Sequence, residues 1–235
     1  MLIQILEKWC TENKISISDK QKSDFEIYSK MLIEWNKKMN LTAITAQDEI
    51  AIKHFIDSIA VIRYIDLKQD STLIDIGTGA GFPGIPIKIM RPDIKITLLD
   101  SLNKRLIFLN DLCKAIDLEA DIIHARAEEL SQNPKYREKF DYATSRAVAN
   151  LPSLCEYCIP YVRVGGTFIS MKGSDGENEL EIAKNAIRLL GGKSNTAHKF
   201  ALPDESTRTI ITVSKIVSTP LKYPRRGIKI SKNPL

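Results

Sequence analysis

A glycine-rich stretch between two apolar segments constrains this chain more than any other feature. Residues 73–100 read LIDIGTGAGFPGIPIKIMRPDIKITLLD, with an apolar segment ending at Asp75, three glycines at alternate positions, and a second apolar segment ending at Asp100. Glycine permits positive φ and lets the backbone approach a ligand closely. In an open α/β sheet, ligands bind beyond the carboxyl ends of the strands, where the strand order changes direction. The stretch therefore predicts two strands of such a sheet with a ligand-binding loop after the first.

The rest of the chain divides into a helical part and a part in which strands and helices alternate. Apolar residues at helical spacing predict a first helix near the N-terminus, a second from about Ser18, and a third over 48–64. The alternating part predicts a mostly parallel sheet with helices on both faces. Its expected strands are 72–76, 94–100, 120–125, 140–145 and 166–171, and its expected helices are 84–91, 103–117, 151–162 and 177–190. The runs 196–201 and 208–216 have no helix between them, which predicts a terminal antiparallel hairpin.

These patterns suggest three parts: an N-terminal helical extension over 1–65, an α/β domain over 66–219, and a basic C-terminal tail over 220–235. The net charge of +5 decides little, because basic and acidic residues nearly balance. The tail is different, since from Lys222 onward it holds five basic residues and no acidic one. Such a segment is either a solvated end of the chain or a surface for phosphates, and composition leaves both open.

Composition also narrows the compartment and the chemistry. No segment approaches the roughly 20 apolar residues of a membrane helix, and the N-terminus does not resemble a signal peptide. Four cysteines in 235 residues are a poor disulfide framework, so we expect reduced thiols in the cytoplasm. Cys155 and Cys158 form a CxxC inside an apolar helical pattern, which favours packing over redox chemistry or a metal site. We therefore expect no metal, and nothing in the sequence suggests an obligate oligomer, so we expect a monomer.

The glycine loop fits two nucleotide motifs that overlap. Residues 79–84 satisfy GxGxxG, the dinucleotide fingerprint, with Asp100 where a ribose-binding acid belongs. Residues 75–81 satisfy DxGxGxG, the loop of methyltransferases that use S-adenosylmethionine. The second interpretation is favoured because Asp75 could face a cationic amino acid moiety, and because a helical prefix precedes the loop and a hairpin ends the sheet. The expected cofactor is S-adenosylmethionine, held in part by Asp75, Gly79 and Gly81.

Other segments strengthen this interpretation through a family resemblance. The chain resembles the bacterial 16S ribosomal RNA guanine-N7 methyltransferases, formerly called glucose-inhibited division protein B. The matching stretches are EWNKKMNLTAI (34–44), HFIDSIAV (54–61), DIGTGAGFPGIPI (75–87), LDSLNKRLIFL (99–109), ARAEEL (125–130), FDYATSRAVANL (140–151), GGTFISMKG (165–173) and YPRRGIKISKNPL (223–235). The resemblance implies a Rossmann-like methyltransferase fold with a seven-stranded sheet. It also implies methyl transfer to N7 of a guanine in the decoding-region loop of the small ribosomal subunit.

The resemblance implies a set of cofactor contacts: Gly77, Phe82, Asp100, Ala127, Glu128 and Arg146. The position of Asp100 at the end of the second strand independently suits ribose hydroxyls. Residues 126–129 fit an adenine-binding edge, but acidic residues also suit a helix N-terminus, so both interpretations stay open. Arg146 follows the fourth strand, where it is expected to contact the cofactor or a guanine rather than an internal carboxylate.

The sequence predicts catalysis by positioning rather than by proton transfer. The fourth strand ends in YATSR, without the Asn/Asp-Pro-Pro-Tyr/Phe element of amine methyltransferases, and no cysteine follows a strand as C5 methylation requires. Guanine N7 has a free lone pair and needs no general base. We therefore expect His54, His124 and His198 to be structural, no residue to act as a catalytic base, and Arg146 to position the reactants.

The expected partner is 16S ribosomal RNA in the small subunit or an assembly intermediate. The candidate RNA contacts are Arg146, Lys172, Lys104, Arg105, Arg225, Arg226, Lys229 and Lys232. Lys104 and Arg105 could equally form a solvated first helical turn. Two other functions remain open at this point: a nicotinamide-dependent oxidoreductase that uses the GxGxxG, and a non-catalytic RNA-binding assembly factor that keeps the cofactor pocket as a sensor.

Overall fold

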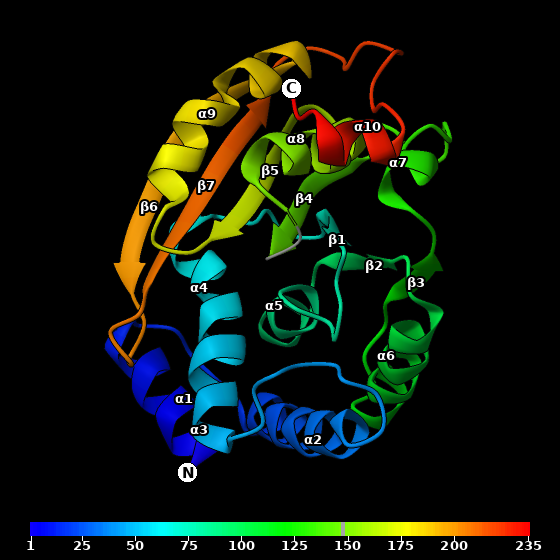
Figure 1. Ribbon diagram of the computed structural model, residues 1–235. Coiled ribbons are helices and arrows are strands. Elements are labelled where there is room, and N and C mark those ends of the chain that lie inside the picture. Colours follow the sequence, from blue (N-terminus) through cyan, green and yellow to red (C-terminus); the bar gives the residue numbers. More distant parts are fainter. Residues whose placement is uncertain (147–148) are drawn as a thin grey trace.

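The computed structural model describes residues 1–146 and 149–235; residues 147 and 148, part of the stretch FDYATSRAVANL, lie outside the described residues. In the described part, seven strands form one sheet in the order β3-β2-β1-β4-β5-β7-β6 (Figure 1). β7 pairs antiparallel with both β5 and β6, and the other neighbours are parallel, which confirms the expected sheet and its terminal hairpin. The strands are β1 (Thr72–Ile76), β2 (Lys95–Asp100), β3 (Asp121–His124), β4 (Phe140–Arg146), β5 (Val162–Lys172), β6 (Gly192–Ala201) and β7 (Thr207–Lys215).

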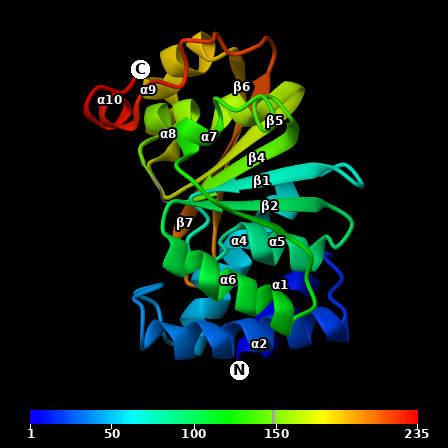
Figure 2. The same cartoon turned by 90° about the vertical axis from the view of Figure 1, so that its right-hand side faces the viewer.

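Helices cover both faces of this sheet. Figure 2 shows α8, α9 and α10 on one face and α4, α5 and α6 on the other, with α1 and α2 forming a further layer outside α5 and α6. Each face has its own cluster of buried apolar side chains. The helices are α1 (Leu2–Glu12), α2 (Asp19–Asn36), α3 (Gln47–Glu49), η1 (Ile50–Ile56), α4 (Asp57–Tyr64), α5 (Gly84–Met90), α6 (Asn103–Ala115), α7 (Ala127–Leu130), α8 (Leu151–Cys158), η2 (Ile159–Tyr161), α9 (Gly176–Leu189) and α10 (Gly227–Lys232).

Two helices of the structure differ in detail from the predicted ones. The helix expected over 151–162 ends at Cys158 and continues as the 3₁₀ turn η2, because Pro160 has no N–H to donate. The third N-terminal helix runs through α3, η1 and α4, and its middle part, η1, is π-helical. Such turns leave the regular hydrogen-bonding pattern, and the carbonyl oxygen of Lys53 in η1 accepts a bond from Arg146 Nη1 at 3.2 Å.

The N-terminal helices hold the glycine loop directly. α2 begins with a capping box in which Ser18 and Gln21 bond each other's backbone. Farther along the same helix, the fully buried Tyr28 donates its hydroxyl to the carbonyl oxygen of Ala80 in the loop. Its ring stacks on Phe82, with centroids 5.2 Å apart. The extension therefore fixes the loop that the sequence marks as the binding element.

The CxxC cysteines are packed inside a helix, as the sequence pattern favours. Cys155 and Cys158 lie buried in α8, and burial raises the pKa of the Cys158 thiol well above its usual value. Across residues 1–146 and 149–235, no cluster of His, Cys, Asp or Glu is arranged to hold a metal ion. None of the helices in this part of the chain is long and apolar enough to cross a membrane.

The Tyr28 hydroxyl gives a direct test of the link between α2 and the loop. Replacing Tyr28→Phe leaves the ring in place but leaves the Ala80 carbonyl oxygen without its donor in a buried site. We expect the free energy of unfolding, measured by urea titration, to fall by about 1–3 kcal/mol. Tyr64→Phe is the matched control, because the half-buried Tyr64 stacks on His198 without a hydroxyl bond in the described part of the chain. An equal effect of the two substitutions would contradict the link.

Candidate functional site

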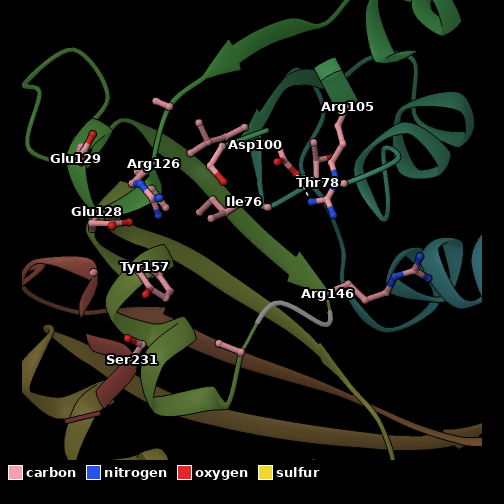
Figure 3. A pocket seen from close by; sticks show the side chains of 18 of the residues that line it. Ile76, Thr78, Asp100, Arg105, Arg126, Glu128, Glu129, Arg146, Tyr157 and Ser231 are labelled. Atoms are coloured by element: carbon pink, nitrogen blue, oxygen red, sulfur yellow. Dashed lines mark hydrogen bonds and ion pairs between the residues drawn. The ribbon is translucent and has the colours of Figure 1, made fainter. Parts of the chain in front are cut away.

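A large cavity, of about 1240 Å³, lies at the carboxyl ends of the strands, where the strand order changes direction between β1 and β4. Ile76 of β1, Asp100 of β2 and Arg146 of β4 line it, as does the glycine loop after β1. Figure 3 shows Arg126 and Glu128 on one side of the cavity and Arg146 on the other. This is where the doubly wound topology predicts a ligand.

Two of the three loop glycines face this cavity. Gly77 and Gly79 line it and have φ of 70° and 61°, a region that favours glycine. A Cβ at Gly79 would meet nothing closer than 4.0 Å, so the backbone there opens onto free space. Gly81 does not line the cavity, and a Cβ there would lie 2.7 Å from the Tyr28 hydroxyl. This glycine makes room for α2. Its expected contact with the cofactor stays a prediction.

Asp75 also has a structural role beneath the loop. Its carboxylate is fully buried beneath the loop and is absent from the cavity lining. Oδ2 accepts bonds from Thr78 Oγ1 at 2.7 Å and from the Gly84 amide at 2.9 Å. Burial raises its pKa to about 6. Asp75 thus braces the loop from within. That it also faces a cationic end of the cofactor stays a prediction.

Asp100 occupies the cavity as expected from its place at the end of β2. Its Oδ2 accepts bonds from the Gly79 amide at 2.9 Å and from Arg105 Nη1 at 3.2 Å, and its Oδ1 accepts from the Leu102 amide at 2.8 Å. Arg105 therefore lines the cavity and pairs with Asp100. The sequence suggested either an RNA contact or a solvated first helical turn for Arg105, and did not indicate this pair. Lys104, one residue earlier, is exposed.

A cluster of aromatic and charged groups closes the cavity near β4. The Phe82 ring stacks on His54 at 4.4 Å between centroids, and the Arg146 guanidinium lies 4.9 Å from the Phe82 centroid. Arg146 Nη1 pairs with Asp57 at 2.8 Å. Arg146 thus pairs with an internal carboxylate, the alternative that the sequence disfavoured. It also lines the cavity, where a ligand could reach it.

The partners of His54 determine which nitrogen carries its proton. Arg146 Nη2 lies 3.2 Å from Nδ1 and can only donate, so Nδ1 accepts and Nε2 donates to Thr42 Oγ1 at 2.8 Å. Burial and the Arg146 charge lower the His54 pKa to about 3, so the ring is neutral near pH 7. The sequence analysis did not place His54 or Asp57 in the site. Their spacing of three residues within an expected helix was the available signal, because it puts both on one face.

The opposite wall comes from α7, α8 and the C-terminal segment. Ala127 and Glu128 line it as expected, and the Tyr161 hydroxyl donates to the Ala127 carbonyl oxygen at 2.7 Å. α7 starts at Ala127 with Glu128 and Glu129 in its first turn, so the helix-terminus interpretation also holds. The sequence analysis missed several other lining residues, among them Gln132, Tyr157, Pro224, Gly227, Ile228 and Ser231.

The candidate RNA contacts fall into two groups. Arg226, Lys229 and Lys232 are exposed, as is Lys104. Arg225 and Lys172 instead have internal partners. The Arg225 guanidinium pairs with the fully buried Glu156 at 2.7 Å, and Lys172 Nζ lies 2.8 Å from Glu179 and donates to the Ala149 carbonyl oxygen at 2.6 Å. The tail is therefore a packed segment rather than a solvated end.

This sheet, with an antiparallel hairpin at its edge and a glycine-lined cavity at its switch point, defines the Rossmann-like methyltransferase fold. Solved structures share it: the PH0226 protein from Pyrococcus horikoshii has a TM-score of 0.56 at 11% identity, covering 77% of this chain and 98% of that protein. The antibiotic-resistance methyltransferase Kmr has a TM-score of 0.50 at 19% identity, covering 63% of this chain and 88% of that one. At these identities the likeness concerns the fold alone.

Sequence comparison gives the family. Residues 21–209 match the family described as rRNA small subunit methyltransferase G. The chain is 47% identical to "Ribosomal RNA small subunit methyltransferase G" of Alkaliphilus metalliredigens over 98% of both chains. It is 51% identical to the protein of the same name from Acetivibrio thermocellus, over 94% of this chain and 91% of that one. The chain belongs to this family.

The depressed pKa of His54 predicts a pH dependence of stability. Between pH of about 6.5 and about 3 the unfolded chain binds a proton at His54 that the folded chain does not. Its contribution to stability is therefore complete above the unfolded pKa and is lost as the pH falls. We expect His54→Gln to reduce the loss of unfolding free energy between about pH 7 and about pH 5, measured by urea titration, by about 1–2 kcal/mol.

The raised pKa of Asp75 acts in the opposite direction, because the folded state binds more protons than the unfolded one below about pH 6. The effect of Asp75 is present in both the wild type and the His54→Gln variant. It therefore cancels when the pH dependence of their unfolding free energies is compared. His198→Gln, in β6, controls for the loss of a histidine as such. If His54→Gln left the pH dependence unchanged, the buried neutral state of His54 would be refuted.

The pair of Arg225 and Glu156 predicts that the tail contributes to stability. Arg225→Ala leaves the Glu156 carboxylate buried without its cation. We expect the free energy of unfolding to fall by about 3–5 kcal/mol in a denaturant titration. Lys184→Ala breaks the exposed pair with Glu181 and should cost less than about 1 kcal/mol. A loss no greater for Arg225 than for Lys184 would show that the tail is not anchored in this way.

Proposed function

We propose that this protein transfers a methyl group from S-adenosylmethionine to N7 of a guanine in 16S ribosomal RNA of the small subunit. The observation that carries the proposal is a second hollow, of about 450 Å³, beside the large cavity. His54 and Arg146 line both. A donor in one and an acceptor base in the other would therefore meet at these two side chains. The names of the family and of its members support an acceptor in small-subunit ribosomal RNA.

The large cavity fits the proposed cofactor. Gly79 lets a ligand approach the backbone, and the Asp100 carboxylate stands at the edge of β2, where ribose hydroxyls would bond it. Three bonds reach the two Asp100 oxygens, which leaves capacity for a further donor, since a carboxylate has about four lone-pair sites. Ala127 and Glu128 line the wall where an adenine would lie. Within this proposal Gly77, Gly79, Phe82, Asp100, Ala127, Glu128 and Arg146 hold the cofactor.

The second hollow suits an electron-rich base joined to phosphates. Its lining includes four cations and two carboxylates, a net charge of +2 with His54 neutral: Lys53, Arg146, Lys172 and Arg208 against Asp57 and Glu179. Arginine and lysine donate readily to guanine O6 in nucleic acid complexes. The carboxylates limit how far these cations move, because Asp57 lies 2.8 Å from Arg146 and 3.3 Å from Arg208. The hollow thus offers fixed donors rather than mobile ones.

The chemistry needs alignment more than proton transfer. The bound cofactor supplies an electrophilic methyl group on a sulfonium, and guanine N7 presents a lone pair without losing a proton. Both nitrogens of His54 are engaged, so its role is to hold Arg146 and Phe82 in place. Holding two reactants at near-attack distance lowers a barrier by about 7–11 kcal/mol. In this proposal Arg146 positions the reactants and no side chain acts as a base.

The exposed cations are the proposed phosphate contacts outside the hollow. Lys104 stands at the start of α6, and Arg226, Lys229 and Lys232 belong to the tail near the other side of the large cavity. Each lost phosphate contact should reduce the slope of log affinity against log salt by about 0.9 or less. In this proposal Arg225 holds the tail in place through Glu156, and Lys172 lines the second hollow beside Glu179.

Labelled S-adenosylmethionine tests the function. We would incubate the protein with small ribosomal subunits from cells that lack it, and separately with the RNA stripped from those subunits, and digest the products to nucleosides. We expect the label in 7-methylguanosine, and the better acceptor identifies the substrate particle. Label in another nucleoside, or none while S-adenosylhomocysteine demonstrably binds, would contradict the proposal.

A further inference from the structure

The C-terminal segment Tyr223–Leu235 packs against the wall of the large cavity that α7 provides. Figure 1 shows α10, in red, lying beside α7 and α8, although at least three strands separate it from either helix in the sequence. Ile230 of α10 is fully buried, and Pro224, Gly227 and Ile228 line the cavity. The segment is therefore part of the cavity wall, a role that neither the tail's composition nor its charge indicates.

Several hydrogen bonds anchor this segment to α8 and to the residues that follow α7. Arg225 bonds the fully buried Glu156 through its backbone amide at 2.7 Å and through its guanidinium. Gln132 Nε2 donates to the Pro224 carbonyl oxygen at 2.9 Å, and Arg137 Nη1 donates to the Tyr223 carbonyl oxygen at 3.0 Å. The backbone immediately before Gly227 is thus held by three separate side chains. Its position relative to α7 is fixed rather than variable.

Gly227 lies directly against the Glu128 carboxylate. A Cβ at Gly227 would stand 2.2 Å from Glu128 Oε1 and 3.0 Å from Glu128 Cδ, and the backbone there is not in the left-handed region. An added side chain at Gly227 would therefore be opposed by the nearness of Glu128 and not by the backbone φ. Because the obstacle is the end of a flexible side chain, an added methyl group would move the carboxylate instead of disrupting the fold.

We propose that the C-terminal segment is a component of the cofactor site, in which Gly227 positions the Glu128 carboxylate for the adenosyl group. The proposal rests on the proposed function, which places that group beside Glu128. Among residues 1–146 and 149–235, the Glu128 carboxylate makes neither a hydrogen bond nor an ion pair, so its oxygens are available to the ligand's amino or hydroxyl donors. Gly227 and the anchor formed by Arg225 and Glu156 are positioning residues, since they act through Glu128.

A double-mutant cycle on cofactor affinity tests this. We would measure S-adenosylhomocysteine binding by calorimetry for the wild type, Gly227→Ala, Glu128→Ala and the double variant. We expect Gly227→Ala to weaken binding about tenfold with an unchanged melting temperature of the ligand-free protein. In the Glu128→Ala background the added methyl group should have no further effect, because its target is gone. Equal weakening in both backgrounds, or none in either, overturns the proposal.

Kinetics separate positioning from a structural or RNA-binding role. With small ribosomal subunits as acceptor, Gly227→Ala should raise KM for S-adenosylmethionine while kcat and KM for the subunit stay unchanged. A change confined to KM for the subunit would assign the segment to RNA instead. If Gly227→Ala does not fold, Arg225→Lys loosens the same segment without filling space, and unchanged affinity in that folded variant overturns the proposal.

Gly173→Ala is the matched control for an added methyl group. A Cβ there meets nothing within 4 Å, and the residue lies in the second hollow, so the control is read only on S-adenosylhomocysteine affinity and melting temperature. Both should match the wild type. The wild-type measurement separates the two proposals: no binding by the wild type refutes the proposed function, whereas normal binding by both wild type and Gly227→Ala refutes only the positioning by Gly227.

Discussion

The stacking of Phe82 between Tyr28 and His54 is the interaction on which the rest of the site depends. Phe82 follows the loop glycines, Tyr28 belongs to α2 and His54 to η1, so three distant parts of the chain meet at one ring. Arg146 from β4 lies over the same ring. A stacked ring with few rotamers fixes the loop backbone relative to the N-terminal helices. The helical extension is thereby a wall of the site rather than an accessory to the sheet.

The two ends of the chain enclose the cavity from opposite sides. N-terminal helices supply His54 and Asp57 beside Arg146, where the large cavity meets the second hollow. The C-terminal segment supplies the wall beside Glu128, held there by Arg225. The sheet itself contributes mainly the strand ends between them. An open α/β sheet exposes its switch point to water, and here that exposure is limited by segments outside the sheet.

The sequence predicted the regular elements closely and the roles of particular loop residues less well. Alternating apolar runs identified β1 and β2 because buried parallel strands are almost wholly apolar. The same pattern could not show that η1 is π-helical, since its carbonyls turn toward Arg146, far away in sequence. The motif likewise gives no means of telling the roles of its glycines apart. Gly79 opens onto the cavity while Gly81 accommodates Tyr28, and only the packing of α2 separates these roles.

By itself the sequence determined the fold class, the terminal hairpin and the family, because these follow from local periodicity and from motifs contiguous in the chain. It also placed Asp100 and Arg146 at strand ends, which the parallel topology brings to one edge. Tertiary structure alone decided that Asp75 is buried beneath the loop, that Arg225 neutralises Glu156, and that the tail reaches the cavity. The residue type of a charged side chain does not reveal whether that side chain faces water or a buried partner. Its role depends on which distant side chain comes within hydrogen-bonding distance when the core closes.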